Sequence, residues 1–418
     1  MFWLPAVLLF YVPSGIVVAH LAREMPLEGG IYQWVKLRFG PMHGFMAAMN
    51  IWLFYVLMCA TIGLQMVSTI PYAVHASAAG IASNKLLIAF STLAVIGIVT
   101  LVAWRGLGIG KWVSTVGGFT TVFLFGAVIV VAVPYWFLGT SVTTPIAISF
   151  PAVSLLNLNL LGKMGCAALS GIDTVAVFAG EFRSKDAGGA IRKSVWIGAP
   201  VIAAIMVLGT ASVLTFSRPD SIDLLMPPVQ VLSLAAPWMG TIASALIVLM
   251  LLAGGSLSFG VLSRLPMVAG WDHLLPEWFS RLHPRYRTPV GSVIFAAVGT
   301  LVFAAVANVG AGNQEAYQFL LNTGLICYGL AYLIMFAIPL LARGEKPSWM
   351  VRVSALSGLA MTLLFVVLSI FPIVEEQNPG LFTIRMLAVL VGLQLAGAAF
   401  YVRAERTRLS SIARAAGA

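Results

Sequence analysis

The stretch from Asn159 to Glu181 reads NLLGKMGCAALSGIDTVAVFAGE. It is apolar enough to enter a bilayer, yet Ser170, Gly171 and Asp173 lie near its middle. A carboxylate at the centre of a membrane helix costs about 2.5–3.5 kcal/mol on insertion scales, so it usually has a partner or faces a wet cavity. Asp173 is therefore the first candidate functional residue.

Glycine makes this stretch a poor continuous helix. Gly162, Gly165 and Gly171 each lower helix propensity by roughly 1 kcal/mol relative to alanine, which predicts local unwinding around Ser170 and Gly171. Interrupted helices at mid-membrane expose backbone groups and form the binding sites of secondary transporters. The alternative is that the small residues only allow neighbouring helices to approach, while Asp173 bonds a nearby hydroxyl.

The composition indicates a polytopic membrane protein. Hydrophobic residues make up 60% of the chain and charged residues 9%, and the mean hydropathy is +0.99. The net charge of +10 comes from residues in short loops between apolar segments, which argues against nucleic acid as a partner. Cys59, Cys166 and Cys327 are scattered within apolar segments, so we expect no disulfide, no metal site and no cofactor.

Apolar segments of about 20 residues are long enough to cross a bilayer as helices. The sequence predicts about eleven of them: Phe2 to Ala22, Gly44 to Tyr72, Leu86 to Trp104, Val113 to Leu138, Leu155 to Phe182, Val195 to Phe216, Ile242 to Ser263, Val290 to Val309, Tyr317 to Leu341, Val351 to Val374 and Leu381 to Val402. The second and the fifth are long, so we expect tilt or a non-helical portion there.

The loop charges alternate as expected of an inserted protein. One side of the membrane receives 20 of the 24 basic residues, including Arg105 and Arg403, whereas the other side receives Lys85, Arg218 and Arg385. Because basic loops face the cytoplasm, we expect a multi-pass protein of the cell membrane with its C-terminus in the cytoplasm.

Three stretches resemble the amino acid permeases of the amino acid-polyamine-organocation superfamily. The first runs from Ala22 to Phe45 and resembles the loop after the second helix of those permeases; the matching residues are Glu24, Pro26, Gly29, Gly30, Tyr32, Trp34, Phe39, Gly40 and Gly44. Gly29 and Gly30 permit a tight turn, after which we expect a short amphipathic helix with its aromatic residues in the headgroup layer.

The other two stretches lie in the second half of the chain. Leu169 to Glu181, with Ala190 to Lys193 after it, is similar to the sixth helix of these permeases and the following loop. Ser263 to Pro276, continuing through His283 to Val290, is similar to their cytoplasmic connection between helices eight and nine.

The resemblance implies an all-α integral membrane protein with two inverted repeats, in which helices one and six are broken. Residues 1–418 would form a single transmembrane domain. Within it, residues 1–138 would be the remainder of the first repeat, 155–341 the second repeat, 351–402 two additional helices and 403–418 a cytoplasmic tail.

On this alignment the first predicted span corresponds to helix two of the family, so helix one is expected to be missing. In the family, helix one supplies the glycine-rich half of the site that receives the carboxylate and amino group of the substrate. Either the true start lies upstream, which we favour, or the chain is a remnant that cannot transport.

The resemblance also points to the third, eighth and tenth helices of the family as walls of the cavity. It adds Trp52, Tyr55, Ser256 and Asn322 to Ser170, Gly171, Ile172 and Asp173 as candidate substrate-binding residues. Aromatic packing and interhelical hydrogen bonding are the alternatives for the four added residues. Asp173 is the only acid deep in a predicted span, so we expect it to carry a proton if transport is proton-coupled.

The leading functional hypothesis is a secondary active transporter, either a symporter or an antiporter, that moves amino acids, polyamines or related amines by alternating access. Its expected partners are this substrate, a proton or a counter-substrate, and the lipid bilayer. One alternative is a truncated relative that acts as a sensor or remnant. A membrane-embedded enzyme is less favoured, because the five histidines show no H-E-x-x-H spacing and no G-x-x-x-x-G-K-[ST] loop is present.

Overall fold

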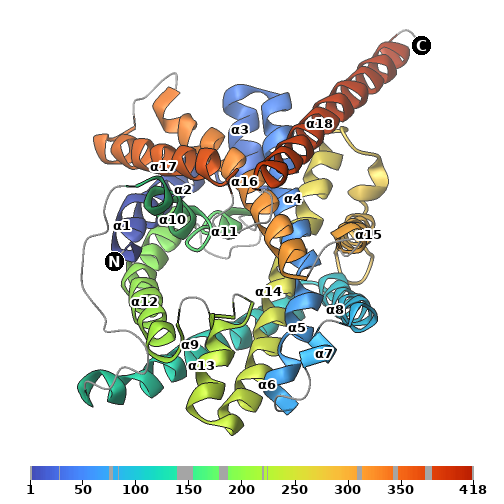
Figure 1. Ribbon diagram of the computed structural model, residues 1–418. Helices are drawn as coiled ribbons and strands as arrows, with labels where there is room; N and C mark the ends of the chain where they lie inside the picture. Colours follow the sequence, from blue (N-terminus) through green and yellow to red (C-terminus); the bar gives the residue numbers. More distant parts are fainter. Residues whose placement is uncertain are drawn as a thin grey trace.

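The computed structural model describes residues 2–27, 29–74, 79–82, 84–138, 154–177, 187–218, 221–223, 225–307, 313–341, 347–371 and 379–416. Within these ranges the regular elements are helices, and the only extended pairing is an isolated bridge between Leu282 and Pro289. The fold is therefore all-α, which confirms the predicted fold class (Figure 1).

The helices follow the predicted apolar segments closely. They are α1 (Trp3–Ala6), η1 (Val7–Tyr11), α2 (Val12–Glu24), α3 (Ile31–Phe39), α4 (Pro41–Ala60), α5 (Ile62–Val67), α6 (Ile70–Val74), α7 (Ala79–Ala82), α8 (Lys85–Arg105), α9 (Leu107–Leu138), α10 (Leu155–Cys166), α11 (Thr174–Val177), α12 (Ala187–Phe216), α13 (Pro227–Ala235), α14 (Pro237–Trp271), η4 (Glu277–Phe279), α15 (Val290–Ala307), α16 (Asn313–Leu341), α17 (Trp349–Leu368) and α18 (Pro379–Ala416).

Nine helices in the described part of the chain are long and apolar enough to cross a membrane. The shorter apolar helix α15 and the interrupted pair α10 and α11 occupy the positions of two further predicted spans. The protein is therefore a multi-pass membrane protein. The total of eleven spans and the absence of the first family helix remain predictions.

Two further predicted spans differ from the expected helices. The second one is divided into α4, α5 and α6 by turns at Thr61 and Thr69, as its length suggested. Gly63 in α5 lies directly against α8, because a Cβ there would come 2.0 Å from Oγ1 of Thr92. The last span does not end at Val402, since α18 continues as one helix through the basic tail to Ala416.

Contacts between distant segments define two ends of the bundle. At one end, Thr288 donates a hydrogen bond of 2.7 Å to the carbonyl of Trp104, and Arg408 lies 3.5 Å from the carbonyl of Asp272. We call this the basic end, because Lys36 and Arg408 lie beside Asp272 there and Arg285 and Arg287 directly precede Thr288. At the opposite end, Tyr72 donates a hydrogen bond of 2.7 Å to Asp223. In Figure 1, α3 and the end of α18 lie at the top, and α6 and α13 lie at the bottom.

Helix α16 is the centre of the core, where it packs against α4 and α17. Tyr332 and Phe336 on α16 are almost fully buried. Gly358 of α17 fits against the Phe336 ring, where a Cβ would come within 2.3 Å of a ring carbon. This close approach holds α17 against α16, and α16 meets the interrupted segment between α10 and α11 through Tyr328 and Tyr332.

Candidate functional site at the interrupted helix

The segment between α10 and α11 is unwound where the sequence predicted it. Helix α10 ends at Cys166, α11 begins at Thr174, and Gly171 between them has a φ of +113°. L-residues other than glycine rarely adopt this conformation, so Gly171 permits the turn. The break places Asp173 against α16.

Asp173 is 1% exposed and is held by two tyrosines of α16. Its Oδ1 accepts a hydrogen bond of 2.6 Å from the hydroxyl of Tyr332 and a short one from the hydroxyl of Tyr328. The tyrosines are four residues apart, so they lie on one face of the helix. Asp173 Oδ2 is buried and has no hydrogen-bond partner among the described residues. The carboxyl group therefore keeps one oxygen for a proton or a ligand.

The tyrosine hydroxyls also connect Asp173 to the unwound backbone. The amide of Gly171 donates a long hydrogen bond of 3.4 Å to the hydroxyl of Tyr332. Tyr332 was not among the predicted site residues. Its spacing of four from Tyr328 was a usable signal, because residues four apart on a helix face the same neighbour.

Tyr55 on α4 lies beside the same cluster. Its hydroxyl is 2.5 Å from Oγ1 of Thr174, and its ring meets the ring of Tyr328 edge to face at 6.3 Å. Tyr55 is 7% exposed. The structure thus brings together Asp173 and Tyr55 from the predicted set, and adds Thr174 and the two tyrosines of α16.

A cavity of about 350 Å³ lies on the other side of the break. Such a volume is within the usual range of small-molecule sites, about 300–1,000 Å³. The residues that line it come from the break, from η1 and from α12, and include Ser170, Gly171, Ile172, Tyr11, Ser194 and Val195. Three of the predicted site residues therefore share one cavity.

Tyr11 lines this cavity from a π-helical turn, Val7–Tyr11, that was not predicted. Pro13 has no N–H to donate to the carbonyl of Leu9, and this carbonyl accepts a hydrogen bond of 2.7 Å from Ser357 instead. Single π-helical turns often occur at functional sites. The proline thus gives a local reason for the altered helix beside the cavity.

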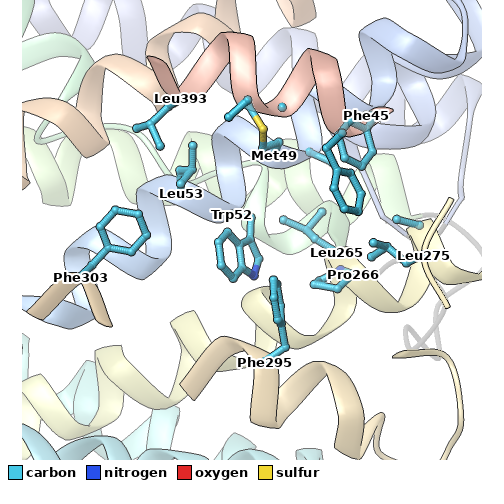
Figure 2. Close-up of a pocket in the computed structure, with 15 residues that line it drawn as sticks. Phe45, Met49, Trp52, Leu53, Leu265, Pro266, Leu275, Phe295, Phe303 and Leu393 are labelled. Atoms are coloured by element: carbon cyan, nitrogen blue, oxygen red, sulfur yellow. The ribbon is translucent and has the colours of Figure 1, made fainter. Parts of the chain in front are cut away.

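The remaining predicted residues lie elsewhere. Trp52 stacks on Phe295 at 4.9 Å and lines a second, apolar cavity (Figure 2). Ser256 and Asn322 are buried in α14 and α16, and neither is among the residues that line the cavity at the break. The structure therefore separates Trp52 from Tyr55, although both are on α4.

A polar cluster at the basic end joins two of the stretches that carry the family resemblance. Lys36 of α3 forms an ion pair of 2.5 Å with Asp272 after α14, and Tyr32 donates a hydrogen bond to the same carboxylate. Burial and this hydrogen bond raise the pKa of Tyr32 above its usual value. Tyr32 is therefore protonated and acts as a donor at neutral pH.

The expectation that the aromatic residues of α3 lie in the headgroup layer is wrong for Tyr32 and Trp34. Tyr32 and Trp34 are 0% and 1% exposed, and the indole of Trp34 donates a hydrogen bond of 2.9 Å to the carbonyl of Met25. The helix itself begins after Gly30, as predicted. Its aromatic face is covered by protein because α3 packs against α4 and α16.

These features define an all-helical, multi-pass membrane protein with a polar site at an interrupted helix, an arrangement typical of secondary transporters. The amino acid permease family matches residues 1–393, so the chain belongs to that family.

The curated relatives agree with this assignment. An uncharacterized transporter of Legionella pneumophila subsp. pneumophila is 26% identical over 356 residues, which cover 83% of this chain and 75% of the relative. Uncharacterized transporters of Mycobacterium bovis and Mycobacterium tuberculosis are 23% identical over 361 residues, which cover 78% of this chain and 76% of each relative. The family and these relatives support a membrane transporter and not an enzyme.

Proposed function

We propose that the protein is a secondary active transporter that moves amino acids or related amines across the cell membrane by alternating access. The observation that supports this most is the buried carboxylate of Asp173, which has two tyrosine donors on one oxygen and no partner on the other. It lies directly beside an unwound backbone segment. Buried acids within membrane segments usually mark substrate or proton pathways.

In this proposal the substrate binds at Ser170, Gly171 and Ile172. These residues line a cavity of about 350 Å³, and the interruption of the helix frees backbone groups near it. Tyr55 covers Thr174, the residue after Asp173, through the contact between their hydroxyl groups. We do not include Trp52 in this site, because it lines the other cavity.

Asp173 is the proposed carrier of the coupled proton. When ionised, it is stabilised by the hydroxyls of Tyr328 and Tyr332 on Oδ1. The unpartnered Oδ2 is then the oxygen that accepts the proton. The proton would be released when the opposite face of the site opens to water.

Purified protein in liposomes with an imposed pH gradient tests this function. The expected result is gradient-driven uptake of at least one labelled amino acid or amine from a panel. Asp173→Asn is expected to abolish uptake driven by the gradient while binding, and exchange without a gradient, persist. Glu277→Gln is the matched control, because this acid is exposed in a loop at the basic end and its neutralisation should leave uptake unchanged.

Two outcomes would contradict the proposal. Unchanged gradient-driven uptake by Asp173→Asn would exclude Asp173 as the proton carrier. Substrate binding without flux under any gradient would favour the alternative of a sensor.

A further inference from the structure

The cavity beside Trp52 is separate from the site around Asp173. It has a volume of about 330 Å³ and lies between α4, α14, α15 and α18. Figure 2 shows Phe45, Met49 and Trp52 around the cavity, with Phe295 directly beside Trp52. Phe295 and Phe400, which also line it, are 39% and 48% exposed. The cavity therefore opens on the outer surface of the bundle, where a membrane protein meets lipid.

The residues that line the cavity are spread along the helices. On α4 its wall extends from Phe45 to Leu53, which is about 12 Å at a rise of 1.5 Å per residue. On α18 it extends from Leu393 to Phe400, which is about 10 Å. One leaflet of a bilayer has a hydrocarbon depth of about 15 Å, half of the whole core. The length of this apolar lining therefore suits a hydrocarbon chain that extends within one leaflet.

A cationic residue comes after the last lining residue of α18, toward the basic end. Arg403 is exposed and lies three residues after Phe400 and seven after Ala396, so it is on the same face of α18 as the lining residues. An exposed arginine at the membrane surface attracts anionic headgroups. The apolar wall and Arg403 together match an amphiphile with an acyl chain and a negative headgroup.

We propose that this cavity binds one acyl chain of an anionic phospholipid from the leaflet at the basic end, with the headgroup at Arg403. The bound chain fills the space between α18 and the rest of the bundle. Helix α18 lies close to α4 at Gly397, where a Cβ would come 2.1 Å from Sδ of Met49, and the lipid would lie beside this contact. The indole N–H of Trp52 has no hydrogen-bond partner among the described residues, and an acyl chain does not provide one.

Native mass spectrometry of the full chain, delipidated in detergent and titrated with phosphatidylglycerol or phosphatidylcholine, tests the proposal. The expected result is one saturable phosphatidylglycerol adduct. Ala396→Trp should weaken it by about tenfold or more, because the indole fills the cavity from an exposed position. Ala399→Trp, also exposed on α18 but outside the cavity, should bind like the wild type.

Two further variants separate the parts of the site. Arg403→Gln should lower the preference for phosphatidylglycerol over phosphatidylcholine by about fivefold, since one basic residue near a membrane contributes about that much. Arg385→Gln, near the opposite end of the same helix, is its control. Trp52→Phe should leave binding nearly unchanged, because the acyl chain does not use the indole N–H.

Three results would overturn the proposal. The first is a wild-type protein with no saturable adduct. The second is an Ala396→Trp protein that binds phosphatidylglycerol as the wild type does. The third is loss of binding in Trp52→Phe, which would mean that the occupant accepts a hydrogen bond and is not an acyl chain.

Discussion

At the scale of single residues, the site depends on how Asp173 is held. Two hydroxyls from α16 converge on one carboxylate oxygen, and the other oxygen stays without a partner in the described structure. Removal of a hydrogen-bond donor from a buried carboxylate costs about 1–3 kcal/mol, because the group has already lost its water. In the proposed mechanism, the two tyrosines therefore stabilise the charged form of Asp173 inside the protein.

Tyr332→Phe tests this dependence. Removal of one of the two donors is expected to slow uptake by about tenfold, since the charged form of Asp173 loses part of its stabilisation. Initial rates of uptake into liposomes are the measurement. Tyr135→Phe is the control, because Tyr135 packs against Phe216 near the end of α9, away from Asp173. Equal rates for Tyr332→Phe and the wild type would show that this hydroxyl is not needed.

Tyr32 gives a prediction about alkaline stability. Its pKa is raised by burial and by the hydrogen bond to Asp272, so the folded protein holds this proton more tightly than the unfolded chain. The resulting stabilisation is complete below the unfolded pKa of about 10 and is lost as the pH rises through the higher folded pKa.

Thermal unfolding in detergent between about pH 9 and pH 11 tests whether stability falls with rising pH in this way. The wild type is expected to lose more stability than Tyr32→Phe above about pH 10, because phenylalanine cannot ionise. Tyr286→Phe, in the loop at the same end, should follow the wild type. Parallel curves for the wild type and Tyr32→Phe would contradict the prediction.

At the scale of elements, the interruption between α10 and α11 depends on the backbone of Gly171. An added Cβ would have room, since the nearest atom is Oγ1 of Thr174 at 4.0 Å, but φ is +113°. Gly171→Ala is therefore expected to destabilise the protein by about 1–2 kcal/mol through backbone strain and to weaken substrate binding.

Gly118→Ala is the matched control for this substitution. Gly118 lies within α9 with no atom close to an added Cβ, so alanine there should be neutral or stabilising by up to about 1 kcal/mol. The test is to measure the melting temperatures of both variants in detergent, together with their substrate binding. A Gly171→Ala protein as stable as Gly118→Ala would mean that the break tolerates a side chain.

The sequence predicted where the helices lie better than it predicted which side of each helix faces the protein interior. Long apolar segments and clustered glycines are local signals, so the helices and the break near Ser170 were predictable. The rotation of each helix is set by its neighbours. For that reason Trp52 and Tyr55, both aromatic and three residues apart, could not be assigned beforehand to the apolar cavity and to the Asp173 cluster, respectively. The burial of Tyr32 and Trp34 was likewise decided by packing of α3 against α4 and α16.

Some elements had no strong local signal. Helix α13 lies in a segment that reads as a loop, although Pro227 is a favourable first residue for a helix. The continuation of α18 beyond Val402 was missed because its hydropathy falls while its helix propensity does not. Tyr332 was missed as a partner of Asp173 because a tyrosine in an apolar segment is usually packed for its ring alone.

At the scale of the whole molecule, the proposed orientation can be checked with single new cysteines. Cys59, Cys166 and Cys327 are buried, so they should react slowly with a membrane-impermeant maleimide. Ser221 and Arg406 are exposed near opposite ends of the bundle. If the basic end is cytoplasmic, Ser221→Cys should be labelled in intact cells and Arg406→Cys only after permeabilisation. The reverse pattern would invert the proposed topology.

Helix α18 has 38 residues, which corresponds to about 57 Å, nearly twice the thickness of the hydrocarbon core. Its last part stands away from the body of the protein in Figure 1. From Arg403 to Ala416 it extends for about 20 Å as a rigid rod that is attached to the end of α14 through Arg408. A fluorophore at its tip would thus report movements of α14, since a small tilt of α14 would cause a larger, measurable displacement of the dye.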